Sequence, residues 1–308
     1  MSESTANLRR KITGAGDLQS VVRTMKAMAA SSISQYENSV LALSEYYRTV
    51  ELGLVACLRK VGSGPLNPKI QGQTAARPIN AVVFGSDQGL VGQFNDVVAD
   101  YAIKTLAALP GEPKVWAVGE RVHARLADAG LPLSGLYAVP NSVKAITPLV
   151  GQVLIESEPQ PSQTAITELY LFHNSPESAA VYAPVSQRLL PLDDQWRRGL
   201  ANLHWPSKNL PEVIGSGRVT LQALIREHLF VSIFRACAES LASENASRLA
   251  AMQRADKNID ELLEDLNSTY HRLRQGGIDE ELFDVIAGFE ALTTNQNGQT
   301  RGSPTTEV

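Results

Sequence analysis

Residues 220–292 read TLQALIREHLFVSIFRACAESLASENASRLAAMQRADKNIDELLEDLNSTYHRLRQGGIDEELFDVIAGFEAL and contain no proline. Apolar residues recur in helical step along this stretch, and Met252, Ile259, Leu266 and Leu273 each follow the last by seven positions. A continuous helix here would be roughly 110 Å long, whereas a typical globular helix has about 11–12 residues. A seven-residue apolar repeat indicates a coiled coil, so this helix needs a second long helix beside it.

The first sixty residues predict that partner. We expect one helix over residues 5–59, because apolar side chains recur there at steps of three, four or their sums. These side chains are Leu8, Ile12, Val22, Met25, Ile33, Tyr36, Val40, Leu43, Tyr47, Val50 and Leu54. The small residues within 27–32 would allow another helix to approach closely.

Between the two helices, the sequence alternates short strands and helices. Residues 62–78 are rich in glycine and proline and predict a linker. Strands are expected at 79–84, 114–118, 168–173 and 181–190, and helices at 96–109, 120–129 and 141–156. This alternation predicts a Rossmann-like α/β domain with a largely parallel sheet. Residues 191–219 predict a crossing loop with room for a short edge strand.

The predicted fold class is therefore α+α/β, an antiparallel coiled coil of the N- and C-terminal helices with an inserted α/β domain. The N-terminal helix takes residues 1–60, the α/β head with its flanking linkers takes 61–219, and the C-terminal helix takes 220–292. Residues 293–308 have no apolar anchor and predict a disordered tail. The helices can meet antiparallel only if the insert lies at one end of the pair.

Composition limits the classes of partner and compartment. The net charge is −4, so the chain has no global basic footprint for nucleic acid or anionic lipid. No apolar run approaches the about 18 residues of a membrane span, and the first residues contain no apolar signal core. Cys57 and Cys237 predict two buried, reduced thiols. We expect a soluble protein of a reducing compartment that meets a membrane only through partners.

Residues 85–92 (GSDQGLVG) are the candidate for a phosphate-binding turn, because they follow a strand and open a helix. They lack the glycine spacings of the known nucleotide-binding loops, so we favour a structural turn in which Asp87 caps local backbone. The five histidines form no metal spacing with cysteine, and no G-x-S-x-G elbow is present. We predict no catalytic residue, no metal and no cofactor, and therefore a mechanical or docking protein.

Three parts of the chain resemble the gamma subunit of F-type ATP synthases. LRRKI (8–12) and TMKAMAA (24–30) are similar to that family's opening motif, and SDQGLVGQFN (86–95) is similar to its D-x-G-L-x-G-x-F-N signature. LASENASRLAAMQRADKN (241–258) and RQGGIDEELFDVIAGFEAL (274–292) resemble its two C-terminal blocks. The blocks occur in the family's order, and the insert between the helices is the least similar part.

The resemblance implies a central rotor shaft that is not catalytic by itself. In that family the terminal helices stand inside a hexameric ring of alpha and beta subunits, and the α/β head meets the epsilon subunit and the membrane ring of c subunits. Proton or sodium flow through the c ring turns the shaft, which couples the flow to ATP synthesis or hydrolysis in beta. The implied location is peripheral, on the cytoplasmic side of a prokaryotic cell membrane, with no direct membrane insertion and no nucleic acid.

The resemblance also implies five residues that contact the alpha and beta ring. These are Met25, Arg248, Gln275, Asp279 and Glu281. Met25 matches a methionine that packs near an acidic loop of beta, and the polar residues match groups that form a catch with ring loops. Arg248 could offer a bidentate guanidinium to a ring carboxylate. Its alternative is an ion pair with Glu244, four residues earlier on the same helix.

Three features depart from the family pattern. Asp279 stands where the family usually has threonine, so a contact with an acidic loop there would be repulsive. Gly276 and Gly277 together cost up to about 2 kcal/mol of helix propensity. Either the helix breaks there and Asp279 caps a restarted helix, or the surrounding ring enforces the helix. The tail from residue 293 extends beyond many members. These departures point to a divergent branch, such as an alternative prokaryotic ion-translocating ATPase.

Two other functions remain open at this point. The first is a nucleotide-binding α/β protein with helical arms, which would use the loop at residues 86–92. The second is a coiled-coil scaffold that does not rotate.

Overall fold

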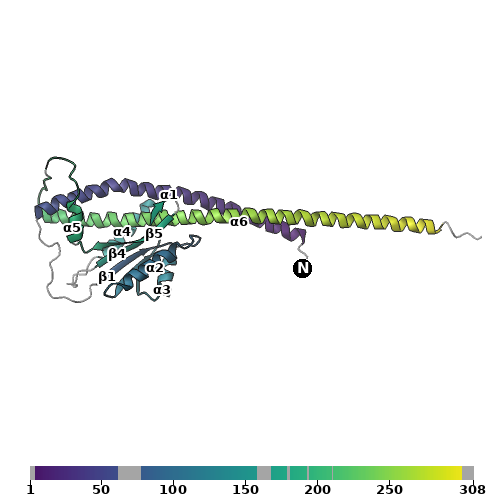
Figure 1. The fold of residues 1–308 in the computed structure, drawn as a ribbon, viewed down its shortest axis with the longest axis horizontal. Coiled ribbons are helices and arrows are strands. Elements are labelled where there is room, and N and C mark those ends of the chain that lie inside the picture. Colours follow the sequence, from purple (N-terminus) through teal and green to yellow (C-terminus); the bar gives the residue numbers. More distant parts are fainter. Residues whose placement is uncertain are drawn as a thin grey trace, which may run out of the picture. The chain divides into compact units, whose positions relative to one another are not determined.

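The computed structural model describes residues 4–61, 78–157, 168–178, 181–192, 194–209 and 211–299. The predicted linker therefore falls almost wholly outside the described residues. Two long helices, α1 (Thr5–Val61) and α6 (Gly217–Gln299), flank the strands and shorter helices in the chain (Figure 1). The contacts divide the chain into two compact units. One unit contains the residues up to Thr24 and those from Gln253 onward, and the other is Met25–Met252.

In the first unit, the start of α1 packs antiparallel against the later part of α6. Gln19 donates a hydrogen bond to Asp260. The Arg23 guanidinium lies 3.3 Å from Asp256 and 3.7 Å from Asp260. Gln19 thus pairs with Asp260 and Arg23 with Asp256, so higher residue numbers on α1 pair with lower ones on α6, as antiparallel helices require. The Arg23 side chain is exposed in both pairs, and ion pairs with an exposed partner stabilise by at most about 1 kcal/mol. Buried apolar side chains such as Leu8 therefore supply most of the packing energy.

In the second unit, the same two helices also run antiparallel. The Tyr46 hydroxyl donates to Glu227 over 2.8 Å, and Lys60 Nζ donates to the Val213 carbonyl over 2.6 Å. An apolar cluster joins the helices with the segment between them. Its buried members are Val50, Leu54, Val55, Cys57, Leu200 and Leu221. The predicted antiparallel pairing of the terminal helices is confirmed, and a supercoil of the pair remains a prediction.

A five-stranded sheet in the order β3-β2-β1-β4-β5 forms the insert. The first four strands run parallel: β1 (Ile79–Phe84), β2 (Pro113–Val118), β3 (Leu133–Tyr137) and β4 (Glu168–Ser178). The last strand, β5 (Val181–Leu190), pairs antiparallel with β4. All six residues of β1 are buried, which is typical of a parallel strand covered on both faces. The predicted largely parallel α/β insert is confirmed.

One face of the sheet is covered by α2 (Phe94–Ala107) and α3 (Glu120–Asp128) (Figure 1). Because side chains alternate along a strand, Ala81 and Val83 of β1 point to this face, where they pack with Val98 and Val122. The same alternation sends Val82 to the opposite face of the sheet.

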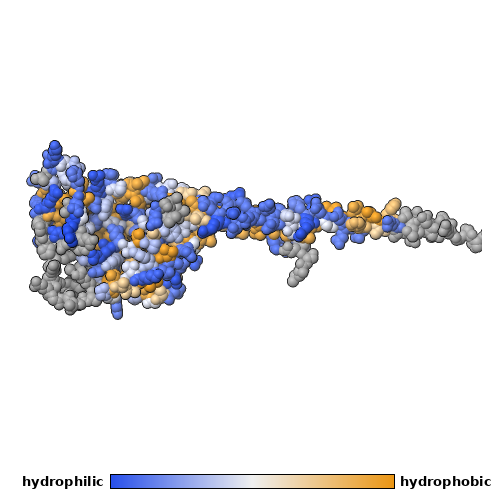
Figure 2. Space-filling model, viewed as in Figure 1, coloured by the Kyte–Doolittle hydropathy of each residue, from blue (hydrophilic) through white to orange (hydrophobic). Residues whose placement is uncertain are grey.

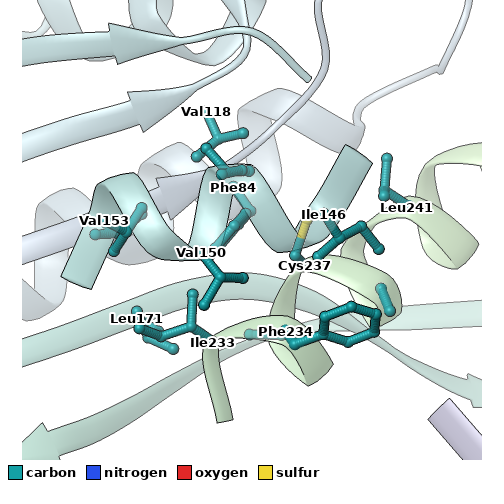
Figure 3. Close-up of a cluster of buried hydrophobic side chains, with 14 of the residues drawn as sticks. Phe84, Val118, Ile146, Val150, Val153, Leu171, Ile233, Phe234, Cys237 and Leu241 are labelled. Atoms are coloured by element: carbon teal, nitrogen blue, oxygen red, sulfur yellow. The ribbon is translucent and has the colours of Figure 1, made fainter. Parts of the chain in front are cut away.

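The opposite face packs against α4 (Val143–Ser157) and α6. Figure 3 shows Ile146 and Val150 of α4 close to Ile233 and Cys237 of α6, with Phe84 of β1 beside them. Nearly every residue of α6 between 231 and 247 is buried, because the sheet, α4 and α1 surround it there. This explains why the stretch is rich in alanine and serine, whose small side chains allow close packing. Cys57 and Cys237 are buried and unbridged, as predicted.

Two elements were not predicted. Strand β3 is a sheet edge whose side chains are only partly buried, so it has no continuous apolar run. Helix α5 (Asp194–Ala201) lies where the sequence predicted a crossing loop, which was wrong there. Its Trp196 ring packs against His228 of α6 at a centroid distance of 5.4 Å, a tertiary contact that no local pattern reveals.

The C-terminal helix differs from its predicted end. α6 passes through Gly276 and Gly277 without a break, so Asp279 does not cap a restarted helix. The helix reaches Gln299, seven residues beyond the expected boundary, and residues 300–308 lie outside the described ranges.

Candidate functional site

The loop between β1 and α2 is where the sequence allowed a phosphate site. Asn95 Oδ1 accepts a hydrogen bond from the Ser86 amide over 2.9 Å, and Asn95 Nδ2 donates to Ser86 Oγ over 2.8 Å. Ser86 Oγ in turn donates to the Gln88 carbonyl over 2.9 Å. The polar groups of Ser86 are therefore bonded to Gln88 and Asn95, and these bonds stabilise the conformation of the loop.

Asp87 ties this loop to two neighbouring segments. Its Oδ1 accepts from the Glu120 amide at the start of α3 over 3.1 Å, and its Oδ2 accepts from the Val139 amide over 3.0 Å. A carboxylate at a helix N-terminus is also favoured by the helix dipole. The sequence predicted that Asp87 caps local backbone, which was wrong: Asp87 does bind backbone amides, but they lie 33 and 52 positions further along the chain.

The crevice between β1 and β4 is the topological switch point of the sheet, where open α/β sheets bind ligands. Here α6 lies against it. Ser247 Oγ donates to the Val91 carbonyl over 2.5 Å, and Ser243 Oγ donates to the Asn174 carbonyl over 3.0 Å. Both serines are buried. A nucleotide would have to displace α6, so the geometry argues against the nucleotide-binding alternative.

The side chain of the predicted contact residue Arg248 pairs with two residues of its own helix, α6. Its Nη2 lies 2.5 Å from Glu244 Oε1, and its Nη1 donates to Asn245 Oδ1 over 3.2 Å. The side chains of Glu244 and Arg248 are 7% and 15% exposed. Burial raises the pKa of Glu244, and the guanidinium opposes that rise. The ion pair that the sequence offered as the alternative for Arg248 is therefore present.

The other predicted contact residues occupy two units. Met25 is half-buried on α1, in the same unit as Arg248. Gln275, Asp279 and Glu281 are exposed on α6 in the other unit. Gln275 and Asp279 are four residues apart and share a helix face, whereas Glu281, two residues further on, lies on another face.

The same part of α6 exposes a group of large apolar side chains. They are Ile278, Leu282, Phe283, Val285, Ile286 and Phe289, with exposed fractions between 46% and 70%. Five of them, at 278, 282, 285, 286 and 289, follow the spacing of a single helix face. Figure 2 shows the resulting hydrophobic colouring on this segment of α6. We call the five residues that share this helix face the apolar face; Phe283 lies on another side of the helix. None of them was among the predicted contact residues, although their helical spacing is visible in the sequence.

Within the described ranges, no group of three or more histidine, cysteine, aspartate or glutamate side chains is arranged to hold a metal ion. None of the helices in the described ranges combines the length and the hydropathy that a membrane span requires.

A family model described as ATP synthase matches residues 4–292. The chain is 28% identical over 294 residues to the ATP synthase gamma chain of Rhizorhabdus wittichii, which covers 92% of this chain and 98% of that protein. It is 24% identical over 298 residues to the ATP synthase gamma chain of Nitrosomonas eutropha, with coverage of 94% and 99%.

Solved structures with a similar fold come from mitochondrial ATP synthases. One chain from the OSCP/F1/c-ring structure of Euglena gracilis has a TM-score of 0.59 at 16% identity, covering 99% of this chain and 98% of that one. One chain from the central stalk and c-ring structure of Tetrahymena thermophila has a TM-score of 0.53 at 18% identity, with coverage of 76% and 99%. At these identities the likeness is evidence about the fold alone.

Proposed function

This chain belongs to the ATP synthase family, and on that premise we propose that it is the gamma subunit, the central rotor shaft, of an F-type ATP synthase. The relatives named ATP synthase gamma chain match it over 92% and 94% of its length, which supports this assignment. The antiparallel terminal helices with an α/β insert agree with it.

The observation that most favours a docked shaft is the apolar face of α6. Contiguous apolar surface of this kind is uncommon on a protein that works alone in water, and it marks an interaction site. We propose that the hexameric ring of alpha and beta subunits surrounds this part of α6. The α/β insert would then contact the epsilon subunit and the ring of c subunits.

The proposed mechanism is mechanical. Proton or sodium flow turns the c ring, the shaft turns with it, and each beta subunit meets a different side of the shaft in turn. A partner can shift a conformational equilibrium only by contacting two states differently, which is what an asymmetric rotating shaft supplies. The nucleotide chemistry belongs to beta, so this chain is non-catalytic. It would be a peripheral protein on the cytoplasmic side of a prokaryotic membrane.

Met25, Arg248, Gln275, Asp279 and Glu281 are proposed contacts with the ring. Arg248 would have to exchange Glu244 for a partner's carboxylate, so its net contribution is a difference between two ion pairs. Asp279 requires a cationic or hydrogen-bond-donating partner, because an acidic loop would repel it.

Reconstitution tests the proposal. Alpha and beta subunits of the same complex are assembled with and without this chain, and steady ATP hydrolysis is measured. We expect fast, cooperative hydrolysis only with the chain present. The double variant Leu282→Glu, Phe289→Glu should lose assembly, whereas Ile214→Glu, at a residue 92% exposed outside the apolar face, should keep it. Equal hydrolysis with and without the chain would exclude the shaft.

Crosslinking distinguishes a rotating shaft from a static scaffold. A cysteine placed on the apolar face and a second in a beta subunit are joined in the assembled complex by oxidation. A rotor should stop turning over ATP and recover when the crosslink is reduced. A scaffold that does not rotate should keep its activity in both states.

A further inference from the structure

The apolar face of α6 lies beyond the reach of α1. In an antiparallel pair, each step back along α1 is a step forward along α6, and Gln19 pairs with Asp260. The fourteen residues from Gln19 back to Thr5, where α1 begins, therefore lead from Asp260 to residue 274. The apolar face occupies residues 278–289, so α1 does not cover it, and its exposure is a consequence of the register of the two helices.

The other sides of this segment are acidic. Asp279, Glu280, Glu281 and Asp284 are exposed, and residues 275–300 contain no lysine, arginine or histidine. At 3.6 residues per turn, Asp279 borders one edge of the apolar face and Glu281 borders the other, while Glu280 and Asp284 lie on the far side of the helix. The apolar face is therefore flanked by negative charge on both edges, with no cation of its own segment to balance it.

This charge pattern argues against a second copy of the chain as the partner. If two such helices packed face to face, in either direction, the carboxylates at both edges of one would stand against those of the other. Like charges set opposite each other across an interface disfavour binding and suppress wrong partners. The apolar face is therefore built for a different molecule.

The same pattern argues against a membrane surface. Amphipathic helices that lie on membranes are rich in lysine and arginine on the polar face, which attracts anionic lipids. Here the polar side carries Asp279, Glu280, Glu281 and Asp284 instead, so an anionic membrane would repel it. A protein groove is the occupant that remains, because amphipathic helices bind such grooves through their apolar residues.

We propose that the apolar face docks into a groove of the alpha–beta ring whose floor is apolar and whose rim carries lysine and arginine side chains. This inference rests on the proposed function, in which the ring surrounds this part of α6, and it adds the chemistry of the ring's contact surface. Cations at the rim pair with Asp279 and Glu281, while the floor buries the apolar side chains. Because charges at the edge of an interface act mainly on encounter, these carboxylates accelerate association.

Association kinetics test the cationic rim. The variant Asp279→Asn, Glu280→Gln, Glu281→Gln, Asp284→Asn removes four negative charges, keeps side-chain size and leaves the apolar face intact. A dye on Ile214→Cys, a site 92% exposed, reports the binding of the full chain to alpha and beta subunits of the same complex. We expect the neutral variant to associate about tenfold more slowly than wild type at about 50 mM salt. At about 500 mM salt the two rates should converge, because salt screens the attraction.

A matched control separates local charge from total charge. Glu37→Gln, Glu112→Gln, Asp128→Asn, Glu212→Gln removes four exposed carboxylates outside this segment and should associate at the wild-type rate. A neutral variant that associates as fast as wild type at low salt would overturn the cationic rim. If Leu282→Glu, Phe289→Glu still loses assembly, the proposed function survives that result. Failure of the wild-type chain itself to associate would overturn both.

The free chain tests the other two occupants. Analytical ultracentrifugation should find a monomer at micromolar concentration, and vesicles of phosphatidylserine should not bind the chain. A dimer that Leu282→Glu, Phe289→Glu abolishes would assign the apolar face to a second copy. Vesicle binding that depends on the same residues would assign it to a lipid surface. Either result would contradict the groove in the ring.

Discussion

The guanidinium of Arg248 lies 2.5 Å from the carboxylate of Glu244, whose other oxygen has no hydrogen-bond partner among the described residues. Arg248 is therefore the main compensation for a buried charge. Arg248→Ala should lower the free energy of unfolding by about 3 kcal/mol near neutral pH, because it leaves that charge unpaired. Urea unfolding of the full chain measures this, and Arg254→Ala, at an exposed arginine of the same helix, is the control.

The sign of the pH dependence follows from Glu244. Burial raises its pKa, so the folded chain binds more protons than the unfolded chain just above the ordinary glutamate range. Stability from this group is therefore greatest at acid pH and falls as pH rises through the folded pKa. Removing Arg248 should strengthen this trend, and adding Glu244→Gln should remove most of it. A loss in Arg248→Ala that is equal at pH 5 and pH 8 would contradict this account.

Much of the fold follows from sequence periodicity. The heptad positions from Met252 to Leu273 predicted the long C-terminal helix, and the apolar run at β1 predicted the buried central strand. The spacing of Glu244 and Arg248 was sufficient to raise their ion pair as an alternative. These features depend on residues that are close together in the sequence, so local patterns encode them.

What could not be predicted depends on how distant segments meet. Ser247 bonds to the carbonyl of Val91 in the loop after β1, and Ser243 to the carbonyl of Asn174 in β4. Both bonds depend on the register of α6 against the sheet, which no local pattern determines. The same holds for the hydrogen bond between His173 and Glu239, which are 66 positions apart in the chain. Helix α5 was missed because its stability depends on tertiary contacts such as that of Trp196.

We predict that His228 lowers the free energy of unfolding in weak acid. Its ring is buried between Tyr47 and Trp196, at centroid distances of 5.5 Å and 5.4 Å, and burial lowers its pKa to about 4 from the ordinary 6.5. The unfolded chain therefore binds more protons between these values. The stability present above pH 6.5 is lost as pH falls through this window, by up to about 3 kcal/mol.

His228→Leu should flatten this part of the stability curve, because leucine has no proton to bind. Chemical unfolding at several pH values between 7.5 and 4 measures the slope. The exposed His204→Leu is the matched control and should keep the wild-type slope. If the slopes of His228→Leu and wild type agree, His228 is not the group that titrates.

The close packing around Gly85, just after β1, leaves no room for a side chain at this position. A Cβ there would lie 2.3 Å from Val122 Cβ and 2.8 Å from Asn95 Oδ1. Gly85→Ala should lower stability by about 3 kcal/mol, because both neighbours are packed. Gly151→Ala, in α4, meets nothing within 4 Å among the described atoms and should be neutral or stabilising by up to about 1 kcal/mol. Thermal unfolding compares the two, and adding Val122→Ala should partly rescue Gly85→Ala.

Because glycine has a low helix propensity, we expect Gly276 and Gly277 to lower the local stability of α6 just before the apolar face. At either position an added methyl carbon would have no described atom within 4 Å, so alanine fits both. The double variant Gly276→Ala, Gly277→Ala should stabilise this part of the helix by up to about 2 kcal/mol. Amide hydrogen exchange over residues 270–290 should slow by up to about thirtyfold, since each 1.4 kcal/mol is a factor of ten. Gly14→Ala, at an open position of α1, should leave exchange in this segment unchanged.

The same double variant distinguishes the two explanations of why the glycines are tolerated. If the surrounding ring enforces the helix, the assembled complex already holds this turn rigid, so stiffening should leave the rate of ATP hydrolysis unchanged. If the shaft bends here during rotation, stiffening should slow hydrolysis, because each step would then have to deform a more stable helix. Slower exchange in the free chain with normal hydrolysis in the complex would favour enforcement by the ring. Unchanged exchange in the free chain would mean that the glycines do not soften α6 at all.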